Sequence, residues 1–150
     1  MAIRGMVLDG DELLLKVSRP VEKFDLRLAQ LVEDMKDTLT QQNGVGLAAP
    51  QVGVLRRVFV INTGDKIQEF INPEFVSREG EQREAEGCLS CPGLWGVTVR
   101  PRKVVGTAFD ILGRRFDFTG EDLMARAFCH EYDHLNGVLF KERVVEWLDK

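Results

Sequence analysis

The sequence predicts a single α+β domain in which antiparallel sheets pack around a central C-terminal helix. Apolar residues recur every three or four positions in two segments, 24–39 and 123–134, whereas the sequence between them alternates as strands do. The sequence has neither strand–helix–strand alternation nor an internal repeat, so a parallel sheet is disfavoured. A length of 150 residues suits one domain with a core of its own, and we assign residues 1–150 to it.

Composition and charge disfavour several classes of protein. The net charge of −4 and the lack of a basic cluster argue against direct nucleic-acid binding. The first residues hold no apolar stretch long enough for a signal peptide, and no apolar run approaches a membrane span, so we expect no membrane association. Three cysteines are too few for a disulfide framework. A reducing, cytoplasmic setting fits, in which thiols remain available as ligands.

The N-terminal third predicts one amphipathic helix followed by a glycine-rich loop. A short apolar cluster at 13–15 is stopped by Pro20, which ends any helix there. The next helix has an apolar stripe at three- and four-residue spacing: Phe24, Leu28, Leu31, Val32, Met35 and Leu39. The Asn-Gly pair at 43–44 forms its C-cap. Residues 44–53 contain three glycines and should form no regular element. This loop either brings backbone close to a ligand or makes a tight connection beneath a sheet.

The remainder predicts strands and then two helices. Strands are expected at 57–62, 69–72, 74–77, 95–99, 103–109 and 116–118. Pro73 separates the second of these strands from the third. The acidic stretch 79–86 is expected to be a solvated edge or hairpin. Residues 119–122 should supply the N-cap and acidic first turn of a helix that closes at 136–137. The apolar residues of 144–148 suggest a short final helix.

Residues 130–134 read His-Glu-Tyr-Asp-His and contain both histidines of the chain. On a helix, His130 and His134 lie one turn apart on one face, so both imidazoles can reach a single metal ion. Glu131 lies close enough to take a proton from a water on the same ion. Leu123 and Ala127 continue the stripe, so the ligands belong to a buried face. A core helix with two hydrogen-bonded histidines is the alternative, but this spacing rarely arises by chance, and we favour a metal site.

A catalytic metal of this kind usually has a third protein ligand, with water in the fourth position. Glu142 and Glu146 lie downstream of the motif, whereas Cys88 and Cys91 lie upstream as a Cys-x-x-Cys pair. Both cysteines could join the histidines in a closed structural zinc site, but the long gap between the two pairs is unlike a zinc finger. A core of this size needs no zinc, and a closed site would leave Glu131 without a role. Spacing therefore favours an open site and does not decide which cysteine completes it.

Three stretches together resemble the signature motifs of the peptide deformylase family, in the family's order and spacing. They are residues 44–51 (Gly-Val-Gly-Leu-Ala-Ala-Pro-Gln), 86–90 (Glu-Gly-Cys-Leu-Ser) and 130–134. The resemblance covers essentially the whole chain and implies one deformylase-like catalytic domain. The implied reaction removes the N-formyl group from the formyl-methionine of newly synthesised polypeptides, with a metal-bound water attacking the formyl carbonyl. Formyl-methionyl nascent peptides are the implied partners. Longer family members dock on the ribosome through a C-terminal tail; the expected final helix is short here, which leaves ribosome binding open.

The resemblance also implies a role for each matching residue. The implied metal ligands are Cys88, His130 and His134. They would bind one ion per chain, typically ferrous iron, with zinc, nickel or cobalt as substitutes. The implied catalytic groups are Glu131 as general acid/base and, for the oxyanion, the Gln51 amide and the Leu89 backbone N–H. Gly46, Glu86 and Gly87 match positions that line the peptide cleft, and Arg100 matches an arginine near it.

A pocket for methionine needs a flexible apolar lining, for which Val45, Leu123 and Ala127 are the candidates. Two positions depart from the family pattern: Cys129 stands where glutamine is usual, and Cys91 where valine or isoleucine is common. Two other classes of function are considered beside the deformylase. A metalloprotease would cleave internal peptide bonds, and a non-catalytic zinc-stabilised domain would release nothing from a formyl peptide.

Overall fold

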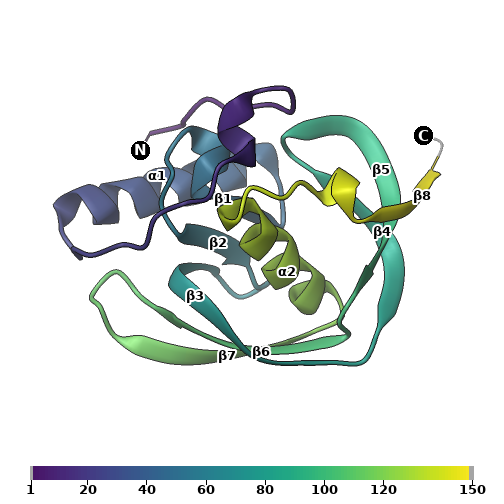
Figure 1. Cartoon of the computed structure of the whole chain (residues 1–150). Helices are drawn as coiled ribbons and strands as arrows, with labels where there is room; N and C mark the ends of the chain where they lie inside the picture. The colour runs from purple at the N-terminus through teal and green to yellow at the C-terminus, as the bar shows by residue number, and fades with distance from the viewer. Residues whose placement is uncertain (1, 149–150) are drawn as a thin grey trace.

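The chain folds as two antiparallel sheets packed around a helix, as expected from the sequence (Figure 1). The computed structural model describes residues 2–148. The larger sheet has the order β1 (Gly46–Ala48), β2 (Val58–Asn62), β3 (Ile67–Glu79), β6 (Lys103–Phe109) and β7 (Arg115–Glu121). The smaller sheet has the order β4 (Gln82–Cys88), β5 (Cys91–Arg100) and β8 (Val144–Leu148). Short 3-10 helices lie at Glu12–Leu15 (η1), Ala49–Val52 (η2) and Phe140–Glu142 (η3).

Helix α1 (Leu26–Gln42) confirms the first predicted helix and its cap. The Asp25 side chain accepts a hydrogen bond of 3.0 Å from the Leu28 backbone N–H, which satisfies one of the donors left free at a helix start. Asn43 ends the helix in the left-handed region, at φ 56°. The predicted apolar stripe is buried against β1 and β2 from Leu28 to Leu39, so this part contributes to the core and does not form a partner surface. Phe24, predicted as the first residue of the stripe, precedes the helix and is 37% exposed.

Helix α2 (Leu123–Leu135) lies in the middle of the molecule, with β6 and β7 below it and β4 and β5 to one side (Figure 1). Its Phe128 is fully buried and packs edge-on against Phe59, with ring centroids 5.3 Å apart. Phe70 and Phe118 also meet this ring, at centroid distances of 5.8 and 5.6 Å. Aromatic packing of this kind adds about 0.5–1.5 kcal/mol per pair beyond area burial. The cluster therefore holds α2 firmly on the larger sheet.

The final segment corrects the sequence prediction, because residues 144–148 form strand β8 instead of a short helix. β8 pairs antiparallel with β5, with Trp95 opposite Leu148 and Val97 opposite Glu146. Five residues are too few to form a stable helix alone, since nucleating a helix is unfavourable. The β-branched pair at the start of the segment favours a strand once a sheet edge is available to receive it.

Three further predictions were wrong in their local detail. The glycine-rich stretch forms β1 and η2 where no regular element was expected; its small side chains let Leu47 and Ala48 reach full burial. Residues 67–79 form one strand and not two, because Pro73 lies in the pairing irregularity between β3 and β6. Asp122 stands at the start of α2 without capping it by its side chain, which binds Arg102 at 2.9 Å. No helix in residues 2–148 is long and apolar enough to cross a bilayer.

Candidate metal centre

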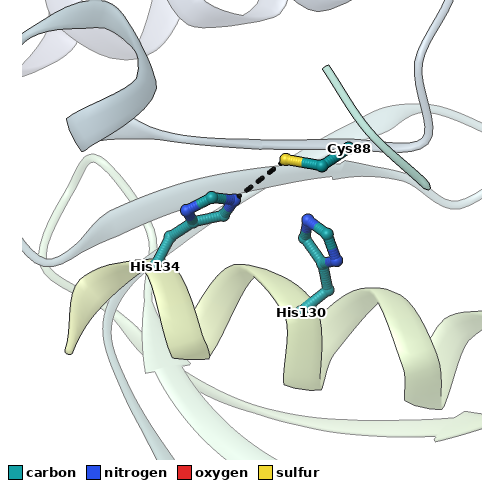
Figure 2. A group of neighbouring side chains, drawn as sticks. All are labelled: Cys88, His130 and His134. Carbon is teal, nitrogen blue, oxygen red and sulfur yellow. Dashed lines mark hydrogen bonds between the residues drawn. The ribbon is translucent and has the colours of Figure 1, made fainter. Parts of the chain in front are cut away.

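His130 and His134 project from one side of α2 towards the end of β4, where Cys88 lies (Figure 2). One possible ligand atom from each of these three residues lies within 4.8 Å of the other two. The Cys88 Sγ is 3.4 Å from the His134 Nε2. Two ligands of a tetrahedral zinc ion, held at about 2.0–2.3 Å from the metal, lie about 3.5 Å apart. The spacing of Cys88 and His134 therefore fits two ligands of a tetrahedral ion.

The ligands considered as alternatives to Cys88 lie outside this group. Glu142 accepts a hydrogen bond of 3.0 Å from the Leu139 backbone N–H and so caps η3. Glu146 lies on β8 and is exposed. Cys91 is buried on the neighbouring strand and does not join the cluster of three in the described chain. A thiol and two imidazoles are donors that zinc and ferrous iron both accept, so the residues present fit such an ion.

A buried carboxylate orients His130. The Glu86 Oε2 lies 2.5 Å from the His130 Nδ1, which leaves the Nε2 of that ring for a ligand. The same carboxylate accepts hydrogen bonds from Thr98 Oγ1, at 2.8 Å, and from Arg100, at 2.7 and 3.2 Å. Burial alone would raise the pKa of Glu86, but the bonds to His130 and Arg100 hold it well below its usual range. Glu86 is therefore a fixed negative charge behind the imidazole.

Arg100 lies behind the cleft and does not line it. Its guanidinium joins two carboxylates, since it also donates to Asp133 at 2.7 Å. The family resemblance implied an arginine near the peptide cleft, whereas the contacts of Arg100 are with Glu86 and Asp133. Because these partners come from β4 and α2, Arg100 connects the strand that carries Cys88 with the helix that carries the histidines.

Glu131 points into the cleft from α2 and is nearly fully buried. Its Oε1 has no hydrogen-bond partner among the described residues, and neither has the His134 Nδ1. Burial raises the pKa of Glu131 to about 7, which suits a group that gains and loses a proton near neutral pH. The space beside it depends on Gly46, where an added Cβ would lie 2.6 Å from the Glu131 Oε2. A residue larger than glycine at position 46 would therefore displace the Glu131 carboxylate.

The Gln51 side chain is held beside Cys88 by three contacts. Its Oε1 accepts a hydrogen bond of 2.9 Å from the Ala48 backbone N–H. Its Nε2 donates to the Ser90 Oγ at 3.1 Å and lies 3.6 Å from the Cys88 Sγ. Ser90 is itself fixed, because its hydroxyl donates to the Val7 carbonyl oxygen at 2.7 Å. An amide N–H is thus fixed next to the candidate metal position.

These groups open onto a cleft of about 550 Å³. The predicted site residues that line it are Val45, Gly46, Gln51, Glu86, Gly87, Cys88, Leu89, Leu123, Ala127, His130 and Glu131. Trp95 and Arg126 also line it, and the sequence analysis missed them. An added Cβ at Gly87 would lie 3.0 Å from the Trp95 ring, so the indole forms a close wall beside that backbone. The register of β4 against β5 brings Trp95 there, and no local pattern in the sequence reports that register.

Cys129, which precedes His130, takes no part in the centre. Its side chain belongs to the core cluster that contains Phe128 and is not one of the three grouped ligand residues. Burial raises the pKa of this thiol to about 11, so it behaves as a small apolar residue.

Comparison with known proteins gives one consistent result. The family model described as polypeptide deformylase matches residues 3–149. The peptide deformylase of Acetivibrio thermocellus is 51% identical over 150 residues, which is 100% of this chain and 88% of that protein. The peptide deformylase of Caldicellulosiruptor bescii is also 51% identical, over 100% of this chain and 90% of that protein. The crystal structure of a peptide deformylase from Legionella pneumophila matches with a TM-score of 0.93 and 45% identity, covering 95% and 86% of the two chains. That from Thermotoga maritima matches with a TM-score of 0.93 and 36% identity, covering 96% and 99%.

Proposed function

From the premise that the chain belongs to the peptide deformylase family, and is a metal-dependent hydrolase that removes the N-formyl group of nascent peptides, we propose how its own residues perform the reaction. The observation that carries the proposal is the grouping of Cys88, His130 and His134 beside the buried Glu131, at the wall of one cleft. Residues 1–150 would act as one catalytic domain.

Cys88, His130 and His134 would hold one metal ion per chain. When bound, such an ion polarises the formyl carbonyl and makes a water molecule nucleophilic at neutral pH. The carboxylate of Glu86 would hold the His130 ring in the orientation that presents its Nε2. Arg100 would act through Glu86 and would not touch the peptide.

Glu131 would carry the proton between water and the leaving amine. Its carboxylate accepts the proton of the attacking water and later delivers it to the nitrogen of methionine, so that formate and a free amino terminus result. The buried Oε1 supports this role, because no side chain within residues 2–148 forms a hydrogen bond to that oxygen. The Gln51 Nε2 and the Leu89 backbone N–H would donate to the oxyanion that develops on the formyl oxygen. The fixed amide of Gln51 beside Cys88 supports its part of that assignment.

The cleft offers an apolar place for methionine and open backbone for the peptide. Val45, Leu123 and Ala127 line one part of it and would contact the methionine side chain. Gly46 and Gly87 leave the main chain accessible, so an extended peptide can pair with it as an added strand. The proposed substrates are formyl-methionyl nascent chains in the cytoplasm, met near the ribosome exit. Because the C-terminal segment is the paired strand β8, no free helix at 144–148 is available for such docking.

Formate release from a short formyl-methionyl peptide by anaerobically prepared protein tests the activity. We expect stoichiometric formate and a free methionyl amino terminus. Cleavage of internal bonds without formate would identify a metalloprotease instead. Unfolding on chelation, with no product from any formyl peptide, would identify a non-catalytic zinc-stabilised domain.

The choice of metal needs a separate test. Affinity order alone predicts that zinc binds this site more tightly than ferrous iron. Ferrous iron expands its coordination more readily and should therefore turn over faster, with cobalt and nickel as working substitutes. The metal-free protein is reloaded anaerobically with each ion, and formate release is measured per bound metal before and after exposure to air. Equal rates with iron and zinc, both unaffected by oxygen, would reject the preference for iron.

A further inference from the structure

The turn between β4 and β5 places a second thiol directly opposite Cys88. Only Leu89 and Ser90 separate the two strands, and the ladder pairs Cys88 with Cys91. Directly opposed residues in an antiparallel pair have Cα atoms about 4.5–5.5 Å apart and side chains on the same face. A disulfide requires a Cα separation of about 4.4–6.8 Å. The register therefore gives the two cysteines the Cα separation that a disulfide requires.

The two thiols differ in their access to solvent. Cys88 lines the cleft and is only partly buried, whereas Cys91 is 2% exposed. A small oxidant entering the cleft therefore meets Cys88 first and leaves Cys91 to react second. This order is typical of redox-sensitive cysteine pairs, in which an accessible thiol is oxidised beside a resolving one. Cys129 is outside the pair, since it lies among apolar side chains of the core.

We propose that Cys88 and Cys91 are an oxidisable dithiol, which peroxide converts into an intramolecular disulfide that withdraws Cys88 from the metal centre and that thiol reductants reverse. The part concerning the metal rests on the proposed role of Cys88 as a ligand. The residue at position 91 would then determine whether oxidation of Cys88 can be reversed. With Cys91 present, the first oxidation step leads to a disulfide, which reductants reverse.

The chemistry balances with hydrogen peroxide as the oxidant. The Cys88 sulfur takes one oxygen as the O–O bond breaks, which gives a sulfenic acid and one water. The Cys91 sulfur then attacks the Cys88 sulfur and displaces that oxygen as a second water. One Sγ–Sγ bond forms, two S–H bonds are lost, and two electrons pass to the peroxide. Without a resolving thiol, the sulfenic acid proceeds to sulfinic and sulfonic acids, which reductants do not reverse.

The test uses the full chain loaded with zinc, because zinc has no redox chemistry and oxidation then reports on the thiols. Zinc binding before peroxide measures the proposed ligand role independently. After peroxide, released zinc is read with a chromophoric chelator and the protein is digested with trypsin. Peptide 84–102 contains Cys88 and Cys91, whereas peptide 127–141 contains Cys129. We expect the first peptide to lose the mass of two hydrogens as zinc is released, with the second unchanged, and dithiothreitol to restore both mass and zinc binding.

Two variants separate this proposal from simple damage to Cys88. Cys91→Val keeps the size and apolar character of the buried side chain and should bind zinc, but peroxide should then add oxygen atoms to Cys88 and dithiothreitol should not restore zinc binding. Cys129→Ala is the matched control and should behave like the wild type. The proposal is overturned if wild-type peptide 84–102 gains oxygen instead of losing hydrogen, or if Cys91→Val recovers as fully as the wild type. Since peptide mapping needs only the wild-type chain, a poorly folding variant does not remove the test. A chain that binds zinc yet forms no disulfide rejects the dithiol and leaves the proposed function intact.

Discussion

The two sides of helix α2 have different surroundings, aromatic on one side and charged on the other. On one side Phe128 packs among aromatic rings of the larger sheet, with centroid distances between 5.2 and 5.8 Å to four phenylalanines. On the other side His130 and Glu131 are also buried, but the His130 ring contacts the charged Glu86, which is paired with Arg100. The aromatic side is enclosed in the core, whereas the charged side borders the cleft.

This difference separates the source of stability from the source of function. Burying a phenylalanine side chain contributes about 1.5–3 kcal/mol and requires little directional precision. A buried ion pair gains little net stability, because removing each charge from water costs several kcal/mol. The charged side of α2 therefore provides orientation and proton chemistry, and the aromatic side stabilises the helix that carries them.

The largest expected effect concerns Cys88. Cys88→Ser should lose most of the metal and with it the activity, because one of the three proposed protein ligands is replaced by a poorer donor. Cys91→Ser is the matched control on the neighbouring strand and should keep both the metal and the activity. Metal content per chain after anaerobic loading is the measurement. Equal metal loss in the two variants would support a closed site with four protein ligands.

The next effect concerns Glu131, on the charged side of the helix. Glu131→Gln keeps the shape of the side chain but cannot accept a proton, so turnover should fall by about 10²–10⁴ while metal binding stays normal. The matched control on the helix is Cys129→Ala, which should keep its turnover. Rates of formate release per bound metal give the answer, and a near-normal rate for Glu131→Gln would reject its role as acid/base.

Arg100 tests whether the buried charges orient the centre. Arg100→Met leaves Glu86 and Asp133 buried without their common partner and should cost about 3–5 kcal/mol of unfolding free energy. Metal affinity should also fall, by roughly 10–100-fold, because Glu86 would no longer be fixed behind His130. Arg102→Met breaks an exposed pair with Asp122 and should change neither quantity appreciably. Unchanged metal affinity in Arg100→Met would limit this network to a structural role.

Phe128 gives the matching test on the aromatic side. Phe128→Ala should cost a similar 3–5 kcal/mol, because it leaves a cavity between α2 and the sheet. In contrast to Arg100→Met, the folded fraction should bind metal with unchanged affinity. Urea unfolding and metal titration of the same samples compare the two variants. A fall in metal affinity as large as that of Arg100→Met would show that the two sides of α2 do not act separately.

The smallest effect concerns an ion pair away from both sides of α2. Burial opposes ionisation of Glu69, but the hydrogen bonds from Lys36 and from the Ile111 backbone N–H, together with the charge of Lys36, outweigh it, so the pKa of Glu69 lies below its usual value of 4.5. A lowered pKa stabilises the fold above the unfolded pKa, and this contribution is lost as the pH falls through the folded pKa. The difference between wild type and Glu69→Gln should be about 1 kcal/mol or less near pH 7 and should shrink as the pH falls below the usual value of 4.5. A difference that stays constant with pH in urea unfolding would contradict this account.

Sequence spacing alone predicted those parts of the protein that depend on neighbours along the chain. The C-cap of α1, its apolar stripe from Leu28 to Leu39, the bounds of β6 and the placement of both histidines on one helix face were confirmed. Each of these features is set by residues two to four positions apart, because a strand repeats every two residues and a helix every 3.6. A periodic pattern in one segment therefore determines which residues share a face.

Tertiary structure decided which segments lie opposite one another. The register of β4 on β5 brings Cys88 into the group with the histidines and leaves Cys91 beside it, a choice that their spacing left open. The same fold takes Arg100 behind Glu86 instead of into the cleft, and an available edge of β5 makes a strand of residues 144–148. These outcomes depend on contacts between residues far apart in sequence, and no local periodicity encodes them. Pairing register and the partners of buried charges are settled only when the whole core assembles.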